Sequence, residues 1–168
     1  MSYHNIIKSY SQDRNVLGQV LPLDTPYTVM VDISDACNLK CKYCFRADES
    51  IVAEDYRKNR LMDWDVFEKV VEQMQQFPQQ IKRIALSHHG EPLCNRRLPE
   101  MVTYIKKSGL TAKTDIHTNA LLLDEPYIDA LCASGIDRIV ISLQGLDEKN
   151  YLDVCGAQID FEQFYHRL

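Results

Sequence analysis

The stretch Thr28-Val29-Met30-Val31-Asp32-Ile33 is followed at once by Cys37-Asn38-Leu39-Lys40-Cys41-Lys42-Tyr43-Cys44. In the first stretch, Val29, Val31 and Ile33 recur at every second position, which is the side-chain period of a β-strand. The second stretch is a polar loop that carries three cysteines. It begins where the predicted strand ends, and parallel α/β folds place their active-site loops at that end of a strand.

Three thiol groups so close in the sequence can converge on one metal centre. If Cys37, Cys41 and Cys44 bind three irons of a four-iron cluster, the fourth iron keeps an open coordination position. An iron with an open position does chemistry, whereas a fully ligated cluster mainly carries electrons. The sequence therefore favours a reactive iron–sulfur site in this loop.

Other interpretations of the cysteines stay open at this point. A zinc site needs a fourth ligand, such as Cys94 or one of His88 and His89. A redox or disulfide role would involve only Cys41 and Cys44 and would leave Cys37 without a function. Buried structural thiols are a poor explanation, because the cluster lies in a polar loop.

The composition is that of a globular protein. The chain has 168 residues, a hydrophobic content of 45%, a charged content of 26% and a net charge of -5. The negative charge argues against a nucleic-acid partner. No apolar run is long enough to cross a bilayer and the N-terminus lacks the apolar core of a signal peptide, so we expect no membrane partner and a cytoplasmic location. In that reducing compartment, six cysteines are more typical of metal ligands or core residues than of disulfides.

Strand and helix patterns alternate along most of the chain. Residues 1–24 are polar and weakly patterned and form an expected N-terminal extension, and residues 25–168 form the expected core domain, with a solvated insertion at 46–60. The expected strands cover 28–33, 81–87, about 113–117 and 139–141, and the expected helices begin near 63, 99, 126 and 161. The last strand is a continuous apolar run, typical of a parallel strand that is buried on both faces. The alternation predicts an α/β fold built from βαβ units around a parallel sheet, either open or curled into a barrel.

The spacing of Cys37, Cys41 and Cys44 resembles the signature of the radical S-adenosylmethionine (radical SAM) enzymes. Tyr43 stands at the aromatic position of that signature. The resemblance implies that the three cysteines hold a [4Fe–4S] cluster, that S-adenosylmethionine is the second cofactor, and that Tyr43 lies beside the adenine. Packing of the loop would explain Tyr43 equally well. The resemblance also implies a partial parallel (β/α) barrel of the radical SAM type, with about four βα units present of an expected six.

The run His88-His89-Gly90-Glu91-Pro92 is similar to the Gly-Gly-Glu-Pro segment of that family. The backbone and the carboxylate of the family segment bind the amino group of the methionine moiety. The resemblance therefore implies cofactor-binding roles for Gly90, Glu91 and Pro92. An ammonium group needs hydrogen-bond acceptors, and a glycine lets the backbone approach closely. His89 departs from the family, because it stands where the first glycine is expected. In isolation, the run would be explained as a turn with a surface glutamate.

Two later segments resemble further family motifs. His117-Thr118-Asn119-Ala120 is similar to a Thr-Asn-Gly segment, which implies that Asn119 contacts the ribose and the methionine carboxylate. An amide side chain both donates and accepts hydrogen bonds, which suits a ribose diol. Ser142-Leu143-Gln144-Gly145 stands in the place of a Ser-Leu-Asp-Gly segment, which implies a hydrogen bond from Ser142 to the methionine carboxylate. A structural role is equally open for Ser142 and is favoured for Gln144.

The remaining cysteines and histidines receive no firm role. Cys132 falls in the expected third helix and is predicted to be a small buried hydrophobic residue. Cys94 is expected near the cofactor pocket, where contact with substrate or metal is the less favoured of its interpretations, and Cys155 is unassigned. No residue is assigned as a general acid or base. Three histidines near the strand ends also have no assigned role, namely His88, His89 and His117.

The resemblance implies an enzyme that cleaves S-adenosylmethionine reductively. A flavodoxin- or ferredoxin-type protein would deliver the electron, and the resulting 5′-deoxyadenosyl radical would abstract hydrogen from a substrate. Residues 90–93 and 141–145 look most like the subgroup that carries SPASM or related auxiliary-cluster domains, in which many members modify peptides or proteins. Glycyl-radical activating enzymes and small-molecule isomerases share the same motifs, so the substrate stays open. The alternatives are a non-catalytic metal-binding or interaction module and a zinc protein.

The short length has its own consequence. With four units, the sheet would end in an unpaired apolar edge at 139–143, and such an edge promotes self-association. The cofactor pocket would also be open on one side. We therefore expect either a piece of a longer enzyme or a chain whose edge is covered by a partner or a second copy, and weak or absent turnover by the isolated chain.

Overall fold

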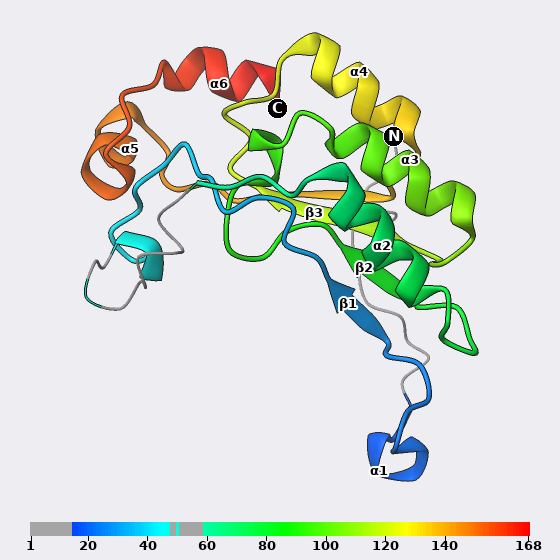
Figure 1. Ribbon diagram of the computed structural model, residues 1–168. Helices are drawn as coiled ribbons and strands as arrows, with labels where there is room; N and C mark the ends of the chain where they lie inside the picture. The colour runs from blue at the N-terminus through cyan, green and yellow to red at the C-terminus, as the bar shows by residue number, and fades with distance from the viewer. Residues whose placement is uncertain (1–14, 48–49, 51–58) are drawn as a thin grey trace, which may run out of the picture.

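The computed structural model describes residues 15–47, 50 and 59–168. Within these ranges, four parallel strands form one sheet whose spatial order, β1-β2-β3-β4, follows the order along the chain (Figure 1). The strands are β1 (Thr28–Met30), β2 (Arg83–Ala85), β3 (Thr114–Thr118) and β4 (Arg138–Ile141). Each falls inside or overlaps a stretch that the sequence predicted as a strand, so the predicted α/β alternation is confirmed.

A helix joins each strand to the next. These crossover helices are α2 (Trp64–Met74), α3 (Leu98–Ser108) and α4 (Glu125–Ser134), and Figure 1 shows them side by side along one face of the sheet. Short elements complete the described chain: α1 (Leu17–Val20), η2 (Phe45–Ala47), η4 (Pro92–Cys94), α5 (Glu148–Cys155) and α6 (Phe161–Arg167). Of these, only α6 was predicted.

The core lies between the sheet and the three crossover helices. Ile84 of β2 and Ile116 of β3 are fully buried against the helix layer. The helices contribute side chains at helical spacing to the same cluster, namely Phe67 and Val71 of α2, Met101 and Ile105 of α3, and Leu131 of α4. This packing fixes the strands, and with them the loops that leave their carboxyl ends.

The ends of the crossover helices follow local sequence signals. Gly109 and Gly135 close α3 and α4 in the left-handed conformation, with φ of 67° and 80°, as glycine does at helix C-termini. The Asp124 side chain caps α4 by accepting a hydrogen bond from the Tyr127 backbone N–H. These ends place the chain at the start of the next strand after only a few residues.

Strand alternation gives the sheet a second face that points away from the helices, which we call the open face. In β3, Asp115 and His117 lie on this face, because they alternate with the buried Ile116. The register places Ala85 of β2 beside Asp115, and Asp115 beside Arg138 of β4. The open face is therefore polar at its centre.

Two sequence predictions about burial are wrong. Cys132 is exposed, because the buried positions of α4 are Tyr127, Leu131 and Ser134 and the next residue after Leu131 faces outward. The last strand is not buried on both faces. Within the described chain β4 is an edge strand, and its Ile139 and Val140 are only half-buried.

Parts of two predicted segments lie outside the described residues. Of the expected extension 1–24, the structure describes 15–24, which contains α1; of the expected insertion 46–60, it describes 46–47, 50 and 59–60. Among the helices of the described part of the chain, none has the length and apolar character needed to cross a membrane.

Candidate functional site

A cavity of about 430 Å³ lies at the carboxyl ends of the strands. Its wall contains the cysteine loop after β1, the turn after β2, the end of β3 and the first residue after β4. Eight of the nine residues predicted to bind metal or cofactor line this cavity: Cys37, Cys41, Tyr43, Cys44, Gly90, Glu91, Asn119 and Ser142. The ninth, Pro92, is buried just behind the wall, as the first residue of η4. The fold thus brings distant motifs to one place.

The three loop cysteines are half-buried free thiols on one wall of the cavity. Burial raises the pKa of the Cys37 thiol, and the nearby Glu91 charge acts in the same direction. Among the described residues, no three His, Cys, Asp or Glu side chains are grouped closely enough to hold a single metal ion. The cysteines of a four-iron cluster bind separate irons, and the role of these three cysteines toward a metal stays a prediction.

Helix α5 anchors the cysteine loop, a contact that the sequence did not predict. The backbone N–H groups of Lys40 and Lys42 donate to the carbonyl oxygens of Cys155 and Val154, over 3.0 and 2.9 Å. The Cys155 side chain is buried. Burial and a hydrogen bond with Cys41 raise the pKa of the Cys155 thiol to about 12. The last turn of α5 thus holds the middle of the cysteine loop in place through these two backbone hydrogen bonds.

The turn after β2 packs directly onto the backbone that precedes Cys37. A Cβ atom at Gly90 would lie 2.0 Å from the Ser34 carbonyl oxygen and 2.8 Å from the Ala36 carbonyl oxygen. The Glu91 backbone N–H donates to the same Ala36 oxygen over 2.7 Å. No other residue type fits at Gly90 without displacing this backbone. Gly90 thus allows close packing of the turn against the backbone before Cys37, and its expected approach to the methionine amino group stays a prediction.

The Glu91 carboxylate is buried and already engaged by protein donors. It accepts hydrogen bonds from the Thr118 hydroxyl over 2.5 Å, the Asn119 backbone N–H over 2.8 Å and the Leu93 backbone N–H over 3.0 Å. Burial raises the pKa of this carboxyl, and the three hydrogen bonds oppose the rise. Its position ties the turn after β2 to the end of β3. The role of Glu91 toward a cofactor stays a prediction.

Asn119 extends this network to the cysteine loop. Its side-chain amide donates to the Asn38 side chain over 2.8 Å, and its side-chain oxygen accepts from the Leu121 backbone N–H over 3.0 Å. The following residue, Ala120, has a φ of 62°. This left-handed conformation explains why a glycine suits the position better than alanine. A continuous set of hydrogen bonds therefore joins the loops after β1, β2 and β3.

The residue that replaces the expected glycine has partners of its own. The His89 backbone N–H donates to the Asp32 carboxylate over 2.9 Å, and its ring nitrogen Nδ1 contacts the other oxygen of the same carboxylate. The His89 ring also packs edge-on against Phe45, with ring centroids 5.3 Å apart. His89 thus links the turn after β2 to both ends of the cysteine loop.

The remaining predicted residues have fewer contacts. Tyr43 is exposed at the mouth of the cavity, and Ser142 lies just beyond β4, where its backbone N–H donates to the Thr118 carbonyl oxygen over 2.8 Å. Gln144 also lines the cavity. Cys94 is half-buried at the end of η4 and is not among the residues that line the cavity.

Solved structures resemble the chain over most of its length. SuiB from Streptococcus suis, bound to the precursor peptide SuiA, superposes with a TM-score of 0.63 at 24% identity, over 87% of this chain and 30% of that chain. BtrN in complex with AdoMet and 2-DOIA gives a TM-score of 0.61 at 23% identity, over 85% of this chain and 52% of that chain. The predicted partial (β/α) barrel is therefore confirmed.

Curated proteins are also similar to this chain in sequence. A probable GTP 3′,8-cyclase from Methanococcus maripaludis is 36% identical over 77% of this chain and 41% of its own length. A protein from Pyrococcus furiosus, described as modifying the cofactor of tungsten-containing aldehyde ferredoxin oxidoreductase, is 31% identical over 69% of this chain and 30% of its own length. The chain thus spans less than half the length of these two relatives. The profile of the Radical SAM superfamily matches residues 31–168. The chain therefore belongs to the radical SAM superfamily.

Proposed function

We propose that this chain is the cofactor-binding part of an enzyme that cleaves S-adenosylmethionine reductively. Membership of the radical SAM superfamily supports an enzyme that uses a [4Fe–4S] cluster and S-adenosylmethionine. The observation that carries the proposal for this chain is the single cavity that Cys37, Cys41 and Cys44 share with the turns at Gly90 and Asn119. When bound, these cofactors supply a 5′-deoxyadenosyl radical that abstracts a hydrogen atom from the substrate.

In this proposal, some residues of the cavity bind the cluster and others bind S-adenosylmethionine. Cys37, Cys41 and Cys44 bind the cluster as thiolates. The turn at Gly90 presents backbone to the methionine amino group, and the buried Glu91 carboxylate holds that turn in place through its three hydrogen bonds. Both features depend on the tight packing of the turn against the cysteine loop.

Residues of other segments bind the ribose, the methionine carboxylate and the adenine of S-adenosylmethionine. Asn119 lies on the wall where the ribose would lie, and Ser142 offers a hydroxyl to the methionine carboxylate. Tyr43 stands at the mouth, where a flat aromatic ring suits an adenine. An electron donor of the flavodoxin or ferredoxin type would reduce the cluster from the exposed side of the loop.

Anaerobic reconstitution tests the metal assignment. Incubation with iron and sulfide should give a brown protein with the broad visible absorption of an iron–sulfur cluster, and Cys41→Ala should lose that absorption. Cys132→Ala is the matched control, because Cys132 is exposed on α4 and does not line the cavity. A colourless wild-type protein, or equal loss in both variants, would contradict the assignment.

A second measurement separates an enzyme from a non-catalytic module. Reconstituted protein should convert S-adenosylmethionine to 5′-deoxyadenosine, at the low rate expected of this chain, when dithionite supplies the electron, because this step needs no substrate. A cluster that forms normally without any 5′-deoxyadenosine would favour the module. Zinc found by elemental analysis at one equivalent in protein purified without added metal would favour the zinc alternative.

The relatives bear on the substrate. The peptide expected from the sequence motifs finds support in SuiB, whose structure holds a precursor peptide, but that likeness has only 24% identity. The probable GTP 3′,8-cyclase is more similar, at 36% identity. We therefore favour a small-molecule substrate over a peptide.

A further inference from the structure

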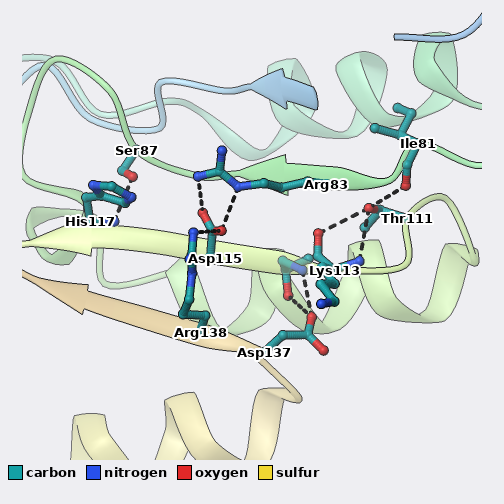
Figure 2. Close-up of polar contacts among 10 residues, drawn as sticks. Ile81, Arg83, Ser87, Thr111, Lys113, Asp115, His117, Asp137 and Arg138 are labelled. Carbon is teal, nitrogen blue, oxygen red and sulfur yellow. Dashed lines mark hydrogen bonds and ion pairs between the residues drawn. The ribbon is translucent and has the colours of Figure 1, made fainter. Parts of the chain in front are cut away.

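A buried carboxylate lies between two arginines at the centre of the open face (Figure 2). Asp115 of β3 accepts hydrogen bonds from Arg83 Nε over 2.7 Å and Arg83 Nη2 over 2.9 Å, so this pair is bidentate. Arg138 of β4 donates to the same carboxylate through Nη2 over 2.9 Å. We call Arg83, Asp115 and Arg138 the triad. Its formal charge is +1.

Arg138 is not needed to neutralise the charge of Asp115. Arg83 alone neutralises Asp115 and occupies both of its oxygens, so bringing Arg138 to the same carboxylate adds repulsion between two cations. Burial would raise the pKa of Asp115, but the two guanidinium groups outweigh it and hold the pKa below its usual value. The carboxylate therefore stays ionised at neutral pH, and the triad keeps one uncompensated positive charge.

Both guanidinium groups retain donors that face the open side. The side chain of Asp115 is 4% exposed, whereas those of Arg83 and Arg138 are 30% and 39% exposed. A guanidinium carries five N–H donors. Asp115 takes two from Arg83 and one from Arg138, and within the described chain neither group contacts another protein acceptor.

One arginine of the triad reaches the cofactor cavity, whereas Asp115 and Arg138 are not among the residues that line it. Arg83 lines the cavity wall together with Cys37, Cys44 and Ser142. Between Arg83 and the cavity mouth the open face carries the small side chain of Ala85 and the exposed ring of His117. A small molecule in the cavity can therefore touch Arg83 and the cysteine end of the same cavity, and Arg138, which is 39% exposed, lies beside Arg83 on the shared carboxylate.

We propose that the triad binds an oxyanion group of the substrate, a carboxylate or a phosphate, and so holds the rest of the substrate toward the cysteine end of the cavity. Free guanidinium N–H groups in a partly enclosed site bind such groups with charge-assisted, often bidentate hydrogen bonds. Asp115 fixes the orientation of both arginines and moderates their charge. The proposal rests on the proposed function, because it assigns part of that same cavity to substrate.

A titration with simple anions tests the proposal on the purified chain. The side-chain Nε–H signals of Arg83 and Arg138 are followed by NMR while inorganic phosphate or succinate is added at constant ionic strength, since surface charge effects are screened by salt. Both signals should move and saturate with one of the anions. Saturation with phosphate alone identifies a phosphate group, and saturation with succinate alone identifies a carboxylate. If neither anion moves the two signals, the proposal is wrong.

Three variants show whether the triad itself is responsible. Arg138→Gln removes the surplus charge and should weaken anion binding about tenfold, which corresponds to about 1.4 kcal/mol. Asp115→Asn raises the triad charge to +2 and should tighten binding. Arg97→Gln is the control, because Arg97 is an exposed arginine of α3's N-terminal end that pairs with Glu100. Equal weakening by Arg138→Gln and Arg97→Gln, or unchanged affinity in Asp115→Asn with native amide signals, would show a purely structural ion triad.

The titration needs neither cluster nor S-adenosylmethionine. Its outcome is therefore separate from the 5′-deoxyadenosine measurement. A chain that cleaves S-adenosylmethionine but does not bind either anion at the triad overturns this inference alone. A chain that binds the anion but forms no cluster contradicts the proposed function and shows an anion site without the substrate role that we assign to it.

Discussion

At the scale of single residues, Gly90 shows most clearly how one position limits the stability of the fold. An alanine there would place its Cβ 2.0 Å from the Ser34 carbonyl oxygen. Gly90→Ala should lower the free energy of unfolding by about 1–3 kcal/mol, the usual cost of overpacking, because backbone must move. Chemical denaturation measures the change. Gly18→Ala is the control, since a Cβ at Gly18 meets nothing within 4 Å, and equal effects of the two would contradict this account.

The hydrogen bonds of Glu91 should contribute measurably to the stability of the protein. The Thr118 hydroxyl and the Asn119 N–H donate to different oxygens of Glu91, so in Glu91→Gln the NH₂ group that replaces one oxygen cannot accept from the donor that it faces. A buried donor left without an acceptor costs about 1–3 kcal/mol. We expect that loss in thermal or chemical unfolding, with shifted amide signals at Asn119. Glu100→Gln, on the exposed surface, should change stability by less than about 0.5 kcal/mol.

The sequence could predict the residues of the site but not all of their partners. Short motifs identified Cys37, Gly90 and Asn119, because each motif follows a strand end and parallel strands bring those ends together. The bonds that hold the motifs in place were not predictable. Glu91 reaches Thr118 and Asn119, more than 25 residues away, and no local pattern encodes such a pair.

Helix α5 is an element that the sequence analysis did not predict. Asp147 caps it, and Tyr151 and Cys155 are buried at the i, i+4 spacing of a helix, so a signal was present. The signal is weak because the helix is short and its mean character is polar. What gives α5 its importance is its contact with the cysteine loop through Lys40 and Lys42, and the sequence does not show that contact.

This anchoring yields a prediction about local stability. Tyr151 is fully buried and packs against Phe164, with ring centroids 5.8 Å apart. Tyr151→Ala should cost about 3–5 kcal/mol, as for other large-to-small core substitutions. The amides of Lys40 and Lys42 should then exchange with solvent faster, as measured by hydrogen exchange.

The control for this prediction lies on the same helix. Leu152 is 54% exposed, so Leu152→Ala should leave exchange at the cysteine loop unchanged. If Tyr151→Ala lowers global stability without any added exchange at Lys40 or Lys42, α5 does not support the loop.

For the full chain, the edge of the sheet governs association. Within the described residues, β4 is an edge strand of the sheet. Its last residue, Ile141, is 37% exposed, and Leu143, just beyond it, is 48% exposed. An apolar edge strand pairs readily with another chain. We expect concentration-dependent dimers in analytical ultracentrifugation, and Ile141→Lys should weaken them. Leu152→Lys, at an exposed position of α5, should not weaken them. A monomer at all concentrations would contradict the prediction.

The sheet order β1-β2-β3-β4 has a consequence for biosynthesis. The strands lie in the sheet in the same order as in the sequence. Each new strand therefore pairs with one that has already left the ribosome. Among the four strands of the described residues, none is inserted later between two strands that are already made. Assembly can therefore proceed stepwise during translation, and the loops that form the cavity become complete in the order in which they are made.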